Sequence, residues 1–62
     1  MSSDVPDDRR RAIFAAVVEA QDAGHSVRAS RELVAARYGI STQEVEAIER
    51  EGLDEGWPPL GG

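Results

Sequence analysis

The sequence contains no cysteine and no lysine, and only one residue each of Phe, Tyr and Trp. Without cysteine, neither a disulfide nor thiolate-bound zinc can contribute to the stability of the fold. A chain of 62 residues buries only about 60% of the surface that its unfolded form exposes, so compact helix packing must supply the stability. We therefore expect one domain over residues 1–62, with flexible ends at 1–4 and 61–62.

Long apolar runs are also missing. No stretch approaches the roughly 20 apolar residues that span a bilayer, and the start MSSDVPDDRRR lacks the apolar run of a signal peptide. We therefore expect a cytoplasmic protein that has no membrane partner. The net charge of −5 argues against nonspecific attraction to nucleic acid or to an anionic membrane.

The charges are unevenly distributed along the chain. Because lysine is absent, all seven positive charges are guanidinium groups, which suit bidentate or stacked contacts. Residues 25–39 carry three Arg against one Glu, whereas residues 40–62 carry one Arg against six acids. The basic side chains therefore lie in the front and middle of the chain, and its end is acidic.

Apolar residues recur at helical spacing in three segments, and no segment alternates as a strand would. In the first segment Ile13, Phe14, Val17 and Val18 form one stripe, and Gly24 can end the helix in a left-handed conformation. The predicted fold is all-α, a small three-helix domain. The expected helices span about residues 6–23, 27–38 and 42–52.

Hydroxyl residues mark the starts of the second and third helices. Either Ser26 or Ser30 can cap the second helix. The third begins with a capping box, in which the Ser41 hydroxyl accepts a hydrogen bond from the amide of Glu44 and the Glu44 carboxylate reaches back. The residues expected on the buried side of this helix are Val45, Ile48 and Leu53.

The end of the chain is rich in glycine and proline. Either Gly52 or Gly56 can end the third helix, and the prolines of the tail GWPPLGG prevent the helix from continuing. Trp57 and Leu60 are apolar enough to seek burial. We expect this Trp-Pro-Pro tail to fold back on the three helices, with binding of a partner as the alternative.

Only the residues YGIS separate the second and third helices, which is the short glycine-containing turn of a helix-turn-helix. The chain reads VAARYGISTQEVEAIEREGL from Val34 to Leu53. This stretch, about a third of the chain, resembles the promoter-recognising C-terminal domain (region 4) of bacterial primary sigma factors, which typically reads IGERFGVSRERVRQIEREAL. Ser30 stands where that family often has Thr. The identical or conservatively replaced residues are Val34, Arg37, Tyr38, Gly39, Ile40, Ser41, Val45, Ile48, Glu49, Arg50, Glu51 and Leu53.

The resemblance implies a bacterial DNA-binding or transcription-associated protein. In the family, the exposed residues of the segment R-E-R-V-R contact bases and phosphates, whereas positions 42–46 here read TQEVE. Arg37 matches a family Arg that can meet the DNA backbone, and Arg50 matches as well. A carboxylate about 4 Å from a phosphate is opposed by roughly 1 kcal/mol in water and by more near a protein surface. The departure from the family therefore weakens DNA reading.

Acidic residues do not abolish DNA reading. Gln43 can pair bidentately with adenine, and a Glu can accept a hydrogen bond from the amino group of cytosine. Phosphate contacts would then come from the arginines of the front and middle of the chain. The residues expected to contact DNA are Arg28, Arg31, Arg37, Thr42, Gln43, Glu46 and Arg50.

A second hypothesis is an acidic protein-protein interaction adaptor that keeps the helix-turn-helix scaffold without binding DNA. A basic protein partner, such as a component of the transcription machinery, would then meet Glu44, Glu46 and Trp57. We expect no enzyme activity, cofactor, metal site or small-molecule substrate. His25 stands alone, and the acids of residues 49–55 lack the ligand spacing of a calcium loop.

Overall fold

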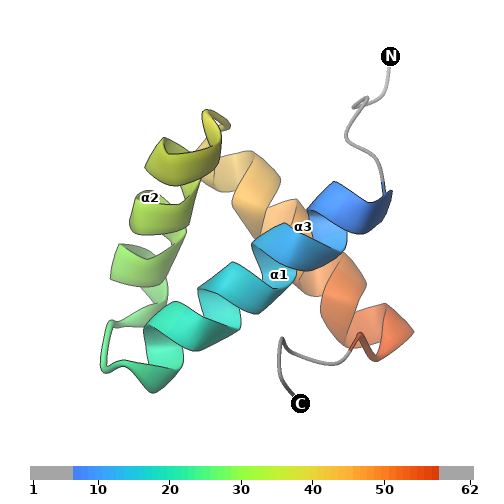
Figure 1. Cartoon of the computed structure of the whole chain (residues 1–62), viewed down its shortest axis with the longest axis horizontal. Coiled ribbons are helices and arrows are strands. Elements are labelled where there is room, and N and C mark those ends of the chain that lie inside the picture. The colour runs from blue at the N-terminus through green and yellow to red at the C-terminus, as the bar shows by residue number, and fades with distance from the viewer. Residues whose placement is uncertain (1–6, 58–62) are drawn as a thin grey trace.

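A computed structural model describes residues 7–57 of the chain. It consists of the helices α1 (Asp7–Asp22), α2 (Val27–Tyr38) and α3 (Thr42–Glu55). No strand occurs within this part of the chain, and the all-α prediction is confirmed. Figure 1 shows α1 crossing α3, with short turns joining α1 to α2 and α2 to α3.

Local capping contacts set the bounds of α2. Ser26 is its N-cap, and the Ser26 Oγ accepts a hydrogen bond from the Ala29 amide at 3.1 Å. Ser30, the alternative cap, lies inside the helix and is fully buried. Gly39 ends α2 with φ 70°, a left-handed conformation that glycine adopts without a steric penalty. The predicted range 27–38 therefore matches the helix.

The start of α3 follows the sequence prediction, but its end does not. Ser41 caps the helix, and its Oγ accepts a hydrogen bond from the Glu44 amide at 3.0 Å. The predicted end at residue 52 is wrong, because α3 continues to Glu55 and Gly56 is its left-handed cap. Gly52 instead lies within the helix and is buried against the ring of Phe14.

The core lies where the three helices face one another. Trp57 joins it directly after α3: its side chain is 8% exposed, and its ring meets Phe14 edge-to-face with centroids 5.9 Å apart. For Trp57 the expected return to the core is observed, while Pro58, Pro59 and Leu60 lie outside the described residues, as do residues 1–4 and 61–62. The buried core residues are Ile13, Phe14, Ala16, Val17, Val34, Ala35, Val45, Ile48 and Trp57.

Leu53 is not part of this core, contrary to the sequence prediction, and 72% of its surface is exposed. The buried residues of α3 are Val45, Ile48 and Gly52. Since each residue turns the helix by about 100°, Leu53 projects well to one side of the line through those three. The apolar character of Leu53 suggested burial, but the phase of the helix directs it to solvent.

Replacing Leu53 with Ala is therefore expected to change the free energy of unfolding by less than about 0.5 kcal/mol. The smaller deletion Ile48→Val in the same helix should cost about 0.5–1.5 kcal/mol, because Ile48 is 5% exposed. Urea unfolding followed by circular dichroism measures both effects. A larger loss for the Leu53 variant than for the Ile48 variant would show that Leu53 is buried.

Candidate nucleic-acid interface

A groove of about 470 Å³ lies between α2 and the first half of α3. Four of the residues expected to contact DNA meet in it, namely Arg28, Arg31, Thr42 and Glu46. Val27 and Glu32 complete its lining. The start of α3 therefore lies beside Arg28 and Arg31 of α2.

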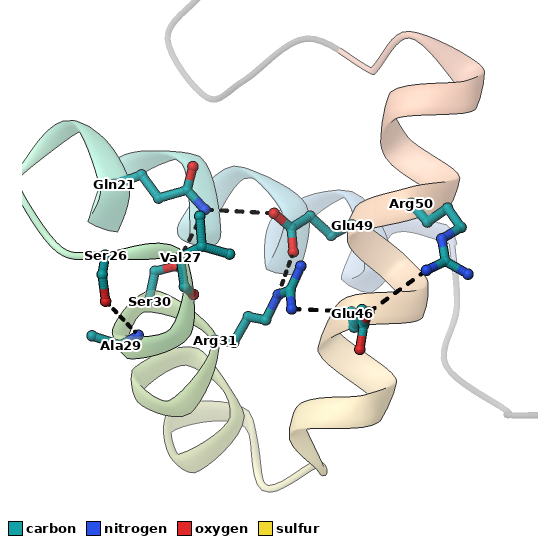
Figure 2. Close-up of polar contacts among 9 residues, drawn as sticks. All are labelled: Gln21, Ser26, Val27, Ala29, Ser30, Arg31, Glu46, Glu49 and Arg50. Carbon is teal, nitrogen blue, oxygen red and sulfur yellow. Dashed lines mark hydrogen bonds and ion pairs between the residues drawn. The ribbon is translucent and has the colours of Figure 1, made fainter.

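Arg31 extends from α2 toward α3 and lies between two carboxylates (Figure 2). Its Nε donates a hydrogen bond to the Glu49 Oε1 at 2.8 Å, and its NH1 lies 3.9 Å from the Glu46 Oε2. The hydrogen bond to Glu49 raises the pKa of Arg31 above its ordinary value, and the charges of both carboxylates add to this effect against a smaller opposing effect of burial. Arg31 therefore remains charged at every physiological pH.

Glu46 is held from two sides. Its Oε2 lies 3.9 Å from Arg31 on α2 and 3.6 Å from the NH2 of Arg50, one turn further along α3. The Glu46 side chain is nevertheless 45% exposed. We call Glu46, Arg31 and Arg50 together the Glu46 clamp.

Hydrogen bonds between polar side chains join all three helices. The Gln21 Nε2 of α1 donates hydrogen bonds to the Ser30 Oγ of α2 at 3.2 Å and to the Glu49 Oε2 of α3 at 3.5 Å. The Ser30 hydroxyl donates in turn to the Val27 carbonyl at 2.7 Å (Figure 2). Sequence reasoning missed Gln21 and the bridging role of Glu49. Ser30 offered a signal, because it lies four residues before Val34 on the buried stripe of α2.

Gln43 and Arg37, which are also expected to contact DNA, do not line the groove. Gln43 is exposed at the start of α3, next to Thr42. Arg37 does not line the groove; its guanidinium lies over the Tyr38 ring, 5.9 Å from the centroid, and the Arg9 guanidinium approaches the same ring. The structure therefore separates Arg37 from Arg28 and Arg31.

Glu44 and Trp57, which are expected to contact a protein partner, differ in their exposure to solvent. Glu44 is partly exposed in the first turn of α3. Trp57 is buried, and the guanidinium of Arg11 lies 5.3 Å from the centroid of its ring. Little of the Trp57 side chain is therefore accessible to a partner.

Comparison of the chain with protein-family models, with curated proteins and with solved structures finds no match. Within residues 7–57, no helix has the length and apolarity needed to cross a membrane. The same residues form no group of three or more His, Asp or Glu side chains that could hold a metal ion. Function must therefore be argued from the groove itself.

Proposed function

We propose that this protein is a helix-turn-helix DNA-binding module of the transcription-associated kind, which lays the start of α3 in the major groove of DNA. The observation that supports this most is the pairing of the α3 acids. Glu49 is hydrogen-bonded to Arg31 at 2.8 Å, and Glu46 lies within 4 Å of both Arg31 and Arg50. Two of the α3 carboxylates that would oppose a phosphate backbone are thus paired with guanidinium groups from α2 and α3.

The exposed side chains around the groove have the chemistry that DNA contacts require. Gln43 and Thr42 stand at the start of α3, where amide and hydroxyl groups can reach base edges. The Arg28 and Arg50 side chains are 90% and 75% exposed, and their pairs with carboxylates are 3.8 and 3.6 Å long. Exposed pairs of this kind contribute only about 0–1 kcal/mol, so both arginines can turn from a carboxylate to a phosphate at small cost.

A fluorescence anisotropy titration with random-sequence and promoter-like duplexes, from about 20 to about 200 mM salt, tests this proposal. The affinity should fall as salt rises, with a slope of about −0.9 for each phosphate contact in a plot of log affinity against log salt. Arg28→Ala and Arg50→Ala should each reduce that slope by about one. Arg37→Ala is the matched control and should leave the slope unchanged, because the Arg37 guanidinium lies over the Tyr38 ring and contacts neither the groove nor Glu46. Absence of binding at the lowest salt would refute the proposal.

A second candidate function is the acidic adaptor, and one observation favours it. Three of the arginines expected to contact DNA already have a carboxylate partner: Arg28 has Glu32, Arg31 has Glu49, and Arg50 has Glu46. If those pairs stay closed, a basic protein would meet the partly exposed carboxylates of Glu44 and Glu46 rather than free arginines.

Replacement of Glu46 with Lys separates the two functions, because it changes them in opposite directions. A DNA-binding module should gain affinity for duplex DNA, since a repulsive charge becomes attractive. An adaptor should lose a basic partner captured from the native host. Glu55→Lys makes the same charge change at the far end of α3 and serves as the control. Unchanged DNA affinity combined with loss of a captured partner would favour the adaptor.

A further inference from the structure

We infer that Glu46 determines the sequence specificity of this module by selecting cytosine at one position of the DNA. This inference rests on the proposed DNA-binding function. The Glu46 side chain lies one turn beyond Thr42 on the groove face of α3, and it is 45% exposed. It therefore combines a place near the expected DNA surface with an accessible acceptor.

The Glu46 clamp distinguishes the two oxygens of the Glu46 carboxylate. The closest approach of Arg31 and the closest approach of Arg50 are both to Oε2. Figure 2 shows the two guanidinium groups approaching Glu46 from opposite sides, one from α2 and one from α3. Oε1 is therefore the oxygen that remains to accept a hydrogen bond from outside, while the pairing offsets the charge that would repel phosphates.

Glu49 cannot accept a hydrogen bond from a DNA base in this way. Its side chain is 16% exposed, and its two oxygens accept from different helices, Oε1 from Arg31 and Oε2 from Gln21. Glu49 thus holds the scaffold together, whereas Glu46 combines pairing with exposure. The two acids of α3 that share Arg31 have different tasks.

A carboxylate can only accept hydrogen bonds, and this decides which base it selects. In the major groove, cytosine presents the N4 amino donor, whereas guanine and the O4 atom of thymine present acceptors that a carboxylate repels. Adenine offers the N6 amino group beside the N7 acceptor, so it is a weaker partner. We expect a preference for cytosine of roughly tenfold, which is at the lower end of what one base contact provides.

The same residue should lower overall affinity, because its carboxylate competes with phosphates for Arg31 and Arg50. Glu46→Gln removes the charge and keeps the shape of the side chain. It should bind DNA more tightly in general, and because an amide pairs bidentately with adenine, its preference should change from cytosine to adenine. A Glu46 that acted only through repulsion would change affinity and leave base preference alone.

Selection of bound sequences from a randomised duplex pool, with wild type, Glu46→Gln and Glu55→Gln in parallel, tests the inference. Amide spectra of each variant first establish that the fold is intact. We expect one position at which wild type and Glu55→Gln enrich cytosine and Glu46→Gln enriches adenine. Identical preferences in wild type and Glu46→Gln, or an altered position at which wild type does not prefer cytosine, would overturn the inference and leave DNA binding standing. Failure of all three proteins to bind DNA at low salt would overturn both.

Discussion

Replacement of Trp57 with Ala should lower the free energy of unfolding by about 3–5 kcal/mol, the cost of removing a large buried aromatic side chain. Trp57 is 8% exposed, and its edge-to-face contact with Phe14 adds stability beyond the buried area alone. A domain of 62 residues has a total stability of only about 3–9 kcal/mol. The variant should therefore be close to unfolding at room temperature.

Urea unfolding followed by far-ultraviolet circular dichroism measures this effect without using tryptophan fluorescence. Trp57→Phe is the matched control, because it keeps a ring against Phe14 and should lose clearly less stability than Trp57→Ala. An unchanged urea midpoint for Trp57→Ala would contradict the placement of Trp57 in the core.

Gly52→Ala should destabilise the fold by about 1–3 kcal/mol, although Ala is normally preferred over Gly inside a helix by about 1 kcal/mol. A Cβ atom at position 52 would lie 2.4 Å from the Cδ1 and 2.6 Å from the Cε1 of the Phe14 ring. That ring also packs against Trp57, so it cannot move away freely. The steric cost therefore outweighs the helix propensity.

A double-mutant cycle with Phe14→Leu isolates this contact. The shorter side chain removes the atoms that a Cβ at position 52 would meet, so Gly52→Ala should cost less in the Phe14→Leu background than in wild type. Equal costs in both backgrounds, or a Gly52→Ala variant more stable than wild type, would show that the helices do not approach each other as described.

Local signals accounted for much of the fold. The caps Ser26 and Ser41 and the left-handed Gly39 act within a few residues of their own position, and the apolar stripe of α1 follows from spacing alone. The burial of Gly52 has a non-local cause, whereas the exposure of Leu53 follows from its position around its own helix. Gly52 packs against the ring of Phe14, a distant residue on another helix, and neither propensity nor periodicity indicates that contact.

The candidate site was predictable only in part for the same reason. The groove brings together Arg28, Arg31, Thr42 and Glu46, all of which the sequence indicated. The sequence did not indicate that Arg31 and Glu49, 18 residues apart, form a hydrogen bond between helices. A count of charges treats every carboxylate of α3 as repulsive to DNA. The structure shows that two of these carboxylates, Glu46 and Glu49, are paired with arginine, so their repulsion is weaker than the count indicates.

Amide NMR spectra recorded during titration with a short duplex at low salt test the proposed DNA-binding face most directly. Chemical shifts should change most at Thr42, Gln43 and Glu46, together with the side-chain signals of Arg28 and Arg50, while Arg37 and the Phe14 and Trp57 rings remain unaffected. Spectra that do not change when duplex is added, or changes confined to the Arg37 and Tyr38 end of α2, would contradict this assignment of the DNA-binding face.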